Sequence, residues 1–418
     1  MSSKGKPSAE MGGGATLVPK LRFPEFIGHP IQDLHLADAT VESTERNGSG
    51  QAPSQIMGVS KVEGIVPMEE RIVAADTARY KFVRKDWFAY NPMRLNIGSI
   101  ARWQGNNDIL VSPDYVVFKC KGAGHHRLDP AYLDHFRRSD AWEEFVSEKG
   151  DGSVRVRIYY KDLARLQLAL PSLPEQQKIA DCLDSVDALI ASQGRKVEAL
   201  GAHKKGLMQQ LFPQEGEGQP RLRFPEFEGA GEWEEKPFSA IVDLISGLHL
   251  SPDEYSESGE VPYFSGPSDF TDELSGASKW TASTTSAARS GDTLITVKGS
   301  GVGEVWFSNL PAIALGRQLM AVRPKEGQIR RFVFQFLLTK KRRFKVLGAG
   351  NLIPGLSRPD ILELKAFFPR GPEQQRIADC LTSLDDLITT ETRKLDTLKT
   401  HKKGLMQQLF PQVGEAGA

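Results

Sequence analysis

Three short stretches carry residue types and spacings that could do chemistry, and the first is a glycine-rich segment. Gly299-Ser-Gly-Val-Gly303 follows the strand-like stretch 293–297, where a nucleotide-binding loop would hold phosphates through its backbone N–H groups. Such a loop must lead into a helix, whereas Glu304-Val-Trp-Phe307 alternates like a strand and no Gly-Lys-Ser/Thr is present. The pattern therefore favours a tight hairpin over a phosphate site.

The second stretch has the residue types of a metal-dependent nuclease. Asp360, Glu363 and Lys365 follow Pro359, but two elements that converge on one metal need more than three residues between the acids. The matching positions near the end of the first half of the chain are Asp162, Arg165 and Gln167, so only the Asp persists. We therefore interpret Asp360 as a cap of a short turn.

The third stretch, Asp129-Pro-Ala-Tyr132, is similar to the (Asp/Asn)-Pro-Pro-Tyr motif of amino-methyltransferases. It lacks the second proline, and no cofactor-binding strand precedes it. No zinc-ligand spacing and no Ser/His/Asp set stands out either. The sequence thus predicts a chain without catalytic residues and without a metal site.

Basic residues mixed with aromatic residues point instead to nucleic acid. Residues 323–345 contain nine Lys or Arg, one Glu and four Phe, and the stretch 84–127 is similarly basic, with Trp87, Tyr90 and Trp103 among its cations. Lys and Arg contact phosphates, whereas Arg, Asn and Gln read base edges. For each stretch alone, a solvated helix face with core aromatic residues is an equal alternative.

Charge and expected loop placement give a set of candidate DNA-binding residues. The set comprises Arg84, Lys85, Tyr90, Arg94, Asn96, Ser99, Arg102, Gln104, Lys119, Lys121, Lys298, Ser300, Arg317, Gln318, Lys340, Lys341, Arg342, Arg343 and Lys345. His125, His126 and Arg127 add to the first patch.

A repeat supplies the elements that must position these residues. Residues 174–214 and 372–412 align without a gap, and 28 of their 41 positions are identical. A shorter echo, LRFPEF, occurs at 21–26 and 222–227. The inserts between these repeated parts, 27–171 and 228–369, do not resemble each other in sequence. The chain therefore reads as one frame that holds two different inserts.

The long repeat predicts a coiled-coil helix, because its apolar residues recur at alternating steps of three and four. The seam positions are Ile179, Leu183, Val186, Ile190, Val197, Leu200, Leu207 and Leu211, then Ile377, Leu381, Leu384, Ile388, Leu395, Leu398, Leu405 and Leu409. Gln193, Lys204, Glu391 and Lys402 fill polar slots in the same register. At 1.5 Å per residue, each helix would be roughly 55 Å long. We expect the two seams to pair antiparallel; separate packing of each helix on its own domain is the alternative.

The inserts read as mixed α/β. Tyr115–Phe118, Val154–Tyr160, Thr293–Val297 and Glu304–Phe307 alternate like strands, whereas Ala131–Ser147 and Arg330–Phe344 look helical. Each insert ends in a strand-like exit before its helix, at 162–171 and 360–369.

Composition limits the remaining choices. The 53 basic and 53 acidic residues cancel, so any DNA-binding surface must be local. No apolar run of about 20 residues exists, and three cysteines without metal or CxxC spacing are typical of a reducing cytoplasm. We expect a cytoplasmic protein.

The repeats resemble the specificity subunit of type I restriction–modification enzymes. The resemblance covers nearly all of residues 19–412 and rests on the PEQQ-I-A-x-L and KKGLMQQLF ends of the long repeat, on 291–300 and Asn351–Ser357, and on Asn96–Ile100 with Ser112–Tyr115. It implies an α+β fold with two α/β target recognition domains separated by two long antiparallel coiled-coil helices in a pseudo-two-fold circular arrangement. The expected segments are an extension (1–18), recognition domain 1 (19–171), spacer helix 1 (172–213), linker and recognition domain 2 (214–369), spacer helix 2 (370–412) and a tail (413–418).

The resemblance also implies the function. Each recognition domain would read one half of a bipartite double-stranded DNA site, and the helix pair would set the unread spacer and dock two modification subunits. S-adenosylmethionine, ATP and Mg²⁺ would bind to the modification and restriction subunits, with no cofactor in this chain. The first LRFPEF runs into Ile27-Gly-His-Pro rather than Glu228-Gly-Ala-Gly, so the inserts could be different subtypes. A duplicated protein-binding scaffold and a solitary methyltransferase or nuclease are the rival functions.

Overall fold

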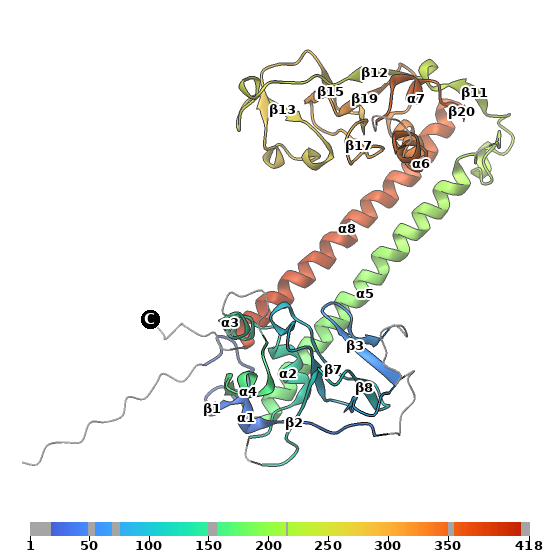
Figure 1. The fold of residues 1–418 in the computed structure, drawn as a ribbon. Coiled ribbons are helices and arrows are strands. Elements are labelled where there is room, and N and C mark those ends of the chain that lie inside the picture. The colour runs from blue at the N-terminus through green and yellow to red at the C-terminus, as the bar shows by residue number, and fades with distance from the viewer. Residues whose placement is uncertain are drawn as a thin grey trace, which may run out of the picture. The chain divides into compact units, whose positions relative to one another are not determined.

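The computed structural model describes residues 18–48, 55–68, 76–124, 126–148, 157–214, 216–349 and 355–410. The extension before residue 18, most of Asn351–Ser357, His125 and the tail lie outside these ranges. The chain divides into unit 1, Met1–Ser192 with Leu395–Ala418, and unit 2, Gln193–Lys394. Figure 1 shows the two long helices, α5 (Leu173–Leu211) and α8 (Gly371–Leu409), which each begin in one unit and end in the other. None of the described helices is long and apolar enough to cross a membrane.

The first insert is built on three small sheets. One four-stranded sheet has the order β2-β9-β6-β7 and another has the order β4-β3-β8-β5, in which β3 and β8 are parallel. The bounds are β2 Thr40–Glu42, β3 Ile56–Ser60, β4 Gly64–Pro67, β5 Lys81–Val83, β6 Phe88–Tyr90, β7 Ile100–Arg102, β8 Ile109–Val111 and β9 Val116–Cys120. A two-stranded sheet of β1 (Gln32–His35) and β10 (Gln167–Leu170) pairs the entry of the insert with its exit.

The second insert repeats this topology with different residues. Its four-stranded sheets have the orders β12-β19-β16-β17 and β14-β13-β18-β15, again with one parallel pair, β13 and β18. The bounds are β12 Val242–Ser246, β13 Val261–Phe264, β14 Trp280–Thr281, β15 Ala287–Arg289, β16 Thr293–Thr296, β17 Val305–Phe307, β18 Ala312–Leu315 and β19 Leu319–Pro324. Entry strand β11 (Glu234–Pro237) pairs with exit strand β20 (Lys365–Phe368). The inserts therefore share one sheet topology despite their unlike sequences.

Helices connect these sheets to the long helices. The first insert carries α1 (Leu36–Ala39), α2 (Pro130–Phe136), α3 (Asp140–Glu148) and α4 (Tyr160–Leu163); the second carries α6 (Arg330–Ala349) and α7 (Arg358–Leu362). The helix predicted over 131–147 is thus two helices, and Ser139 lies at their junction, where its carbonyl accepts the Glu143 N–H. The strand predicted over 154–160 is wrong in its described part, because Tyr160 begins α4.

Both predicted strands of the glycine-rich hairpin are present. Strands β16 and β17 pair antiparallel, and Gly299 and Gly303 both have a φ of 86°. This left-handed conformation favours glycine, which explains why the loop between the strands needs these residues. The segment is a hairpin within a sheet and leads into no helix.

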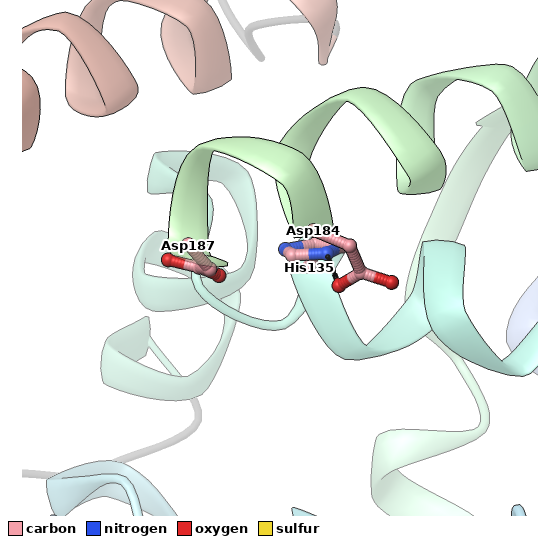
Figure 2. Close-up of side chains that lie close together, drawn as sticks. All are labelled: His135, Asp184 and Asp187. Atoms are coloured by element: carbon pink, nitrogen blue, oxygen red, sulfur yellow. Dashed lines mark hydrogen bonds and ion pairs between the residues drawn. The ribbon is translucent and has the colours of Figure 1, made fainter. Parts of the chain in front are cut away.

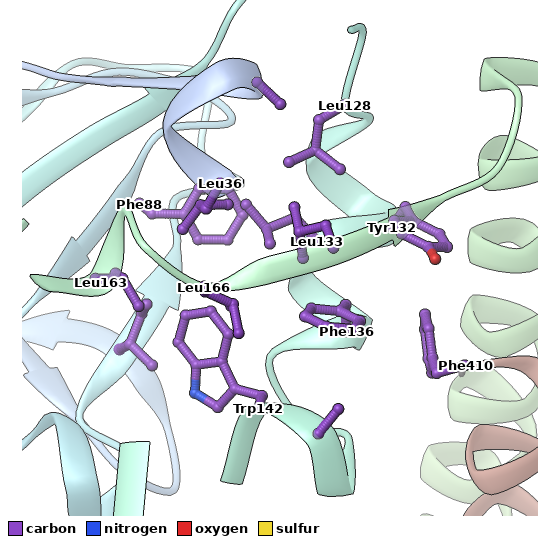
Figure 3. Packing of buried hydrophobic residues seen from close by; sticks show 14 of the residues in the cluster. Leu36, Phe88, Leu128, Tyr132, Leu133, Phe136, Trp142, Leu163, Leu166 and Phe410 are labelled. Atoms are coloured by element: carbon purple, nitrogen blue, oxygen red, sulfur yellow. The ribbon is translucent and has the colours of Figure 1, made fainter. Parts of the chain in front are cut away.

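The core of the first insert continues into the long helices. Leu36, Phe88 and Trp142 pack in the same buried cluster as Phe410, which directly follows α8 (Figure 3). Ile179 of α5 belongs to the same cluster. In unit 2 the equivalent cluster joins Phe332 and Phe336 of α6 to Leu211 and Phe212. Each insert is therefore attached to helix ends by apolar burial, the dominant favourable term in folding.

Within each unit the two helical segments run antiparallel. In unit 1 the polar slot Lys402 donates to Asp187 at 2.6 Å, and in unit 2 its repeat equivalent Lys204 donates to Asp385 at 2.5 Å. Near the middle of the helices, Gln193 donates to Glu391 at 2.7 Å. All sixteen predicted seam residues are buried or half-buried. The α+β class, with two sheet domains and long antiparallel helices, is confirmed.

Candidate nucleic-acid interface

The repeated frame holds each insert through a buried ion pair at a helix start. In unit 1, Arg22 of the first LRFPEF donates to both carboxylate oxygens of Glu175, at 2.8 and 2.5 Å. In unit 2, Arg223 donates to both oxygens of Glu373, at 2.9 and 2.7 Å. A two-pronged guanidinium–carboxylate contact fixes orientation as well as distance. We call each of these ion pairs a latch: it joins the LRFPEF segment to the first turn of a long helix.

The next repeated residue ties the insert itself to the helix. Gln176 donates to the carbonyls of Arg127 and Pro171, at 2.9 and 2.8 Å, and accepts the Asp129 N–H. In unit 2, Gln374 donates to the Pro369 carbonyl at 2.9 Å. These buried amides explain why the PEQQ sequence is repeated while the inserts are not: in unit 1 the Gln176 amide contacts backbone groups of the insert, which any sequence provides.

A second polar contact connects each insert to its long helix. In unit 1 this contact includes the one group of possible metal ligands found among the described residues. The ligand atoms of His135, Asp184 and Asp187 all lie within 4.8 Å of one another (Figure 2). His135 Nε2 lies 2.8 Å from Asp184 Oδ1, and Lys402 donates to both oxygens of Asp187 at 2.6 Å. An ammonium group already occupies the position that a cation would take at Asp187.

The corresponding place in unit 2 favours a hydrogen-bonded anchor over a metal site. Asp385, the repeat equivalent of Asp187, accepts from Lys204 at 2.5 Å and from Gln335 of α6 at 2.9 Å. Thr382 stands where unit 1 has Asp184. An amide and a threonine are poor substitutes for an imidazole and a carboxylate as metal ligands. We interpret His135 and Gln335 as equivalent anchors.

The structure divides the candidate DNA-binding residues by their surroundings, and two of them are buried. Tyr90 lies in the core of the first insert with no exposed surface, and burial raises the pKa of its phenol. Ser99 is 4% exposed and donates to the Val59 carbonyl. A DNA duplex could reach neither side chain without rearrangement of the core, so we withdraw both from the set.

Other candidates are exposed in part but already have partners. Arg84 donates to Glu45 and Asp108, which raises the pKa of its guanidinium, and it lies over the Trp87 ring. Lys341 and Lys345 both pair with Glu304, at 2.6 and 2.8 Å, and lower the pKa of its carboxyl. The remaining members of this group are Arg102 with Asp86, Lys119 over Trp87, Lys121 with the Ala37 and Asp38 carbonyls, and Lys340 over Phe336.

One pair of exposed candidates in each insert lies on an equivalent loop, and the other exposed candidates lie elsewhere. Arg94 and Asn96 lie in the loop between β6 and β7, and Lys298 and Ser300 lie in the loop between β16 and β17. Arg317 and the half-buried Gln318 lie in the turn between β18 and β19. Lys85, which donates to Asn106, and Gln104 are exposed elsewhere in the first insert, and Arg342 and Arg343 are exposed on α6.

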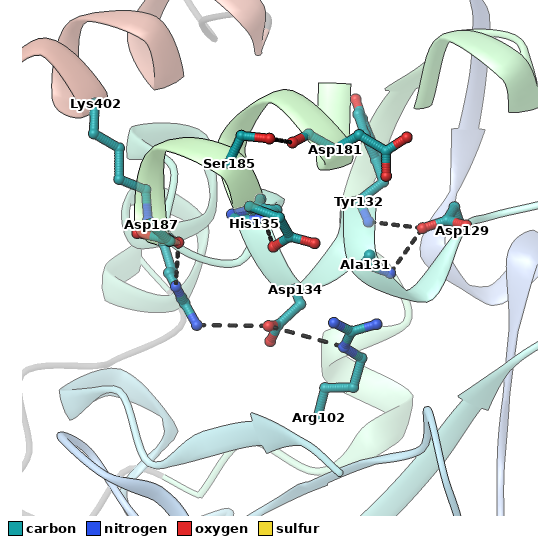
Figure 4. Close-up of polar contacts among 12 residues, drawn as sticks. Arg102, Asp129, Ala131, Tyr132, Asp134, His135, Asp181, Ser185, Asp187 and Lys402 are labelled. Atoms are coloured by element: carbon teal, nitrogen blue, oxygen red, sulfur yellow. Dashed lines mark hydrogen bonds and ion pairs between the residues drawn. The ribbon is translucent and has the colours of Figure 1, made fainter. Parts of the chain in front are cut away.

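The first insert also has a groove that the sequence did not predict. Its volume is about 480 Å³, and Lys61, Glu63, Gln104, Arg137 and Arg138 are among the side chains that line it. Asp134, which also lines the groove, accepts from Arg137 at 2.7 Å. Its carboxylate also lies 3.9 Å from Arg102 Nε (Figure 4). The adjacent Arg137 and Arg138, within the helix predicted over 131–147, were the available sequence signal.

Comparisons with known proteins agree with this architecture. The family model described as "Type I restriction modification DNA specificity domain" matches residues 142–200 and 230–400, more than half of the chain. A Methanocaldococcus jannaschii protein named "Putative type I restriction enzyme MjaX specificity subunit" is 26% identical over 351 residues, which cover 82% of this chain and 81% of the relative. The type I restriction enzyme MjaVIII specificity subunit of the same organism is 24% identical, over 68% of this chain and 70% of its own length.

Solved structures show the same fold. The type I restriction–modification S subunit from M. genitalium covers 95% of this chain and 100% of its own, with a TM-score of 0.62 and 15% identity. A chain from work on complex assembly and conformational transition of the type I R-M system covers 92% and 98%, with a TM-score of 0.57 and 20% identity. The chain therefore belongs to the family of type I restriction–modification DNA specificity subunits.

Proposed function

We propose that each insert reads one half of a bipartite DNA site, that α5 and α8 set the unread spacer, and that the chain itself catalyses no reaction. The observation that carries this proposal is the shared topology of two inserts with unlike loops. Both have the same strand order and the same parallel pair, yet Arg94 and Asn96 stand where the other insert has Lys298 and Ser300. One scaffold with two sets of exposed polar residues suits two different base sequences.

The pairing of entry and exit strands supports the proposal that each insert recognises DNA independently. Strands β1 and β10 bring the two ends of the first insert together, and β11 and β20 do so in the second. An element whose ends are adjacent can be exchanged with little effect on the rest of the chain. Two of the frame's side chains, Arg22 and Gln176, contact backbone groups of the insert.

The expected partners are double-stranded DNA, two modification subunits and the restriction subunits. S-adenosylmethionine would be bound by the modification subunits, and ATP and Mg²⁺ by the restriction subunits. The near-identical repeats support two equivalent docking positions, because exposed residues of α5 and α8 match at most positions. The assembled complex would act at the two half-sites that this chain has bound.

Selection from randomised duplexes tests the proposal. The purified chain, and the chain with its modification subunits, should enrich two short sequences at a fixed separation, with affinity that falls steeply as salt rises. Replacement of residues 27–171 with the insert of another family member should change one enriched sequence only. Enrichment of a single uninterrupted sequence, or salt-independent binding to a protein partner alone, would contradict the proposal.

The helices provide a second test. Insertion of one heptad into each of α5 and α8 adds roughly 10 Å of helix, the length of about three base pairs. The separation of the half-sites should increase while both half-sites stay the same. The pure chain, incubated with S-adenosylmethionine or Mg²⁺ and DNA, should show no turnover; methylation or cleavage by the chain alone would favour the rival enzyme function.

A further inference from the structure

Gln318 is held in an unusual setting at the edge of the second insert. It lies in the short turn between β18 and β19, where Leu319 donates to the Gly316 carbonyl at 2.8 Å. The Gln318 carbonyl accepts the Val297 N–H at 2.7 Å, which ties this turn to the start of the glycine-rich loop. The backbone of Gln318 is therefore fixed by two neighbouring strand ends.

Two glycines make room for the Gln318 side chain. A Cβ atom built on Gly266 would lie 3.1 Å from Gln318 Oε1, and one built on Gly299 would lie 3.2 Å from the same atom. Both distances are shorter than ordinary van der Waals contact, so a larger residue at either place would displace the carboxamide. The side chain thus packs against two stretches of glycine backbone that limit where the amide can point.

The Gln318 carboxamide is held in place, but it makes no hydrogen bond with the described residues of the fold. Among the described residues it has no hydrogen-bond partner, although it is only half exposed and lies beside the exposed Gly299. Lys298 and Arg317 flank it, and both side chains are exposed and make no ion pair in the described ranges. Lys341 and Lys345 on α6 are, by contrast, paired with Glu304. The Gln318 amide, held in place between the exposed cations Lys298 and Arg317, is suited to bind a polyanion that also carries hydrogen-bonding groups.

We infer that Gln318 is a specificity-determining residue that reads an adenine in the half-site of the second insert. The inference rests on the proposed function. Its amide would accept a hydrogen bond from adenine N6 and donate one to N7 on the major-groove edge, the pair of contacts that a glutamine makes best. Lys298 and Arg317 would contact the adjacent phosphates and hold the turn in register.

Selection from randomised duplexes with Gln318→Ala tests the inference. The wild-type chain should require A·T at one position of the second half-site, and the variant should lose that preference by roughly 10- to 100-fold. Every other enriched position should stay the same. Gln318→Glu should shift the same position towards C·G, because a carboxylate accepts from cytosine N4.

Gly266→Ala tests the packing without a change at residue 318. Gly266 has a φ of −169°, an extended backbone that alanine adopts freely, so the new methyl group acts only through the carboxamide. It should weaken discrimination at the same base pair as Gln318→Ala. Gln177→Ala, an exposed glutamine on α5, is the matched control and should change no position.

The outcomes separate the two proposals. If the wild-type chain enriches a bipartite site and Gln318→Ala keeps every preference, Gln318 is not a base-reading residue and the proposed function stands. A Gln318→Ala variant that loses affinity equally for all duplexes also overturns the inference, because it indicates a phosphate contact. If the wild-type chain selects no bipartite site, both proposals fail.

Discussion

The two inserts use one strand order but place their available charges differently. In the first insert Arg84 and Arg102 are engaged by carboxylates of neighbouring segments, and Arg94 and Asn96 remain exposed between β6 and β7. In the second, Lys341 and Lys345 are engaged by Glu304, and Lys298 and Arg317 remain exposed. Clusters of basic residues in the sequence therefore overstate the surface available to DNA, because most of the cations in each cluster already contact acidic, backbone or aromatic groups of the same insert.

The frame contacts show a second difference, at the buried ion pairs. Glu175 has Arg22 as its hydrogen-bonding partner, whereas Glu373 accepts from Arg223 and also from Trp233 Nε1 at 3.2 Å. The first insert begins with Ile27-Gly-His-Pro and has no tryptophan at the matching place. The Arg22–Glu175 and Arg223–Glu373 ion pairs are therefore equivalent in position, but only the second has an additional hydrogen bond from a tryptophan.

The largest expected effect is the loss of the latch in unit 1. Arg22→Ala should destabilise unit 1 by about 3–5 kcal/mol, because it leaves a fully buried carboxylate without its partner. Arg223→Ala should cost less in unit 2, since Trp233 still donates to Glu373. Hydrogen exchange of peptides from each unit measures the two effects separately.

Arg22→Ala combined with Glu175→Gln provides the control for the latch. Removal of the buried charge should recover part of the lost stability, because an amide is less costly to bury than a carboxylate. Equal destabilisation by Arg22→Ala and Arg223→Ala would show that the Trp233 contact contributes nothing.

The next effect separates exposed from engaged cations. Lys298→Ala should lower the affinity for DNA uniformly across sequences and reduce the slope of log affinity against log salt by about 1. Lys341→Ala, in the same insert, should change the slope less, because that lysine already forms an ion pair with Glu304. Arg94→Ala and Arg84→Ala form the matched pair in the first insert.

Titration of DNA binding at several salt concentrations gives these slopes. Equal slopes for Lys298→Ala and Lys341→Ala would mean that DNA displaces Glu304 from its lysines. The division into exposed and engaged residues would then not describe the bound state.

A smaller, pH-dependent effect distinguishes the two anchors. Burial lowers the pKa of His135, so the folded state binds its proton less readily than the unfolded chain. Stability that is fully present above the ordinary pKa of histidine, about 6.5, should therefore decrease as the pH falls through that value. His135→Gln, which copies Gln335 of unit 2, should remove this decrease.

Thermal unfolding at pH 7.5 and pH 5.5 measures the acid sensitivity, with Gln335→His as the reciprocal variant. That substitution should introduce acid sensitivity into unit 2. If His135→Gln stays as acid-sensitive as the wild-type protein, other groups control the pH dependence. Added Zn²⁺ or Mn²⁺ should not raise the unfolding temperature if the group is an anchor and not a metal site.

The smallest expected effect concerns the polar slots of the helices. Lys402→Met and Lys204→Met should each change the stability of their unit by at most about 1 kcal/mol, because both pairs are partly exposed to solvent. Since the two pairs occupy equivalent positions, the changes should be equal. A larger loss from Lys402→Met would indicate that its contact with Asp187 also supports the His135 anchor.

Several features of this fold follow from the sequence alone. The three-and-four spacing from Ile179 to Leu211 specifies a long helix with one apolar face, and its near copy supplies an equivalent second helix. The alternation on either side of Gly299–Gly303 specifies a hairpin. The interpretation of Asp360 as a cap is met in a different form: Ser357 is the N-cap of α7, and its N–H donates to the Asp360 carboxylate at 2.7 Å. These are local properties, set by periodicity and by residues with particular backbone preferences.

Tertiary structure decided the rest. Nothing in the unlike sequences of the inserts indicates their common strand order, because pairing between strands such as β3 and β8 depends on contacts far apart in the chain. Burial of Tyr90, the engagement of Arg84 by Glu45, and the glycine setting of Gln318 likewise depend on which segments meet. The sequence determined by itself the repeated frame and the kind of residues it holds. Only the fold determined which of those residues face solvent, because exposure is a property of neighbours that local patterns do not specify.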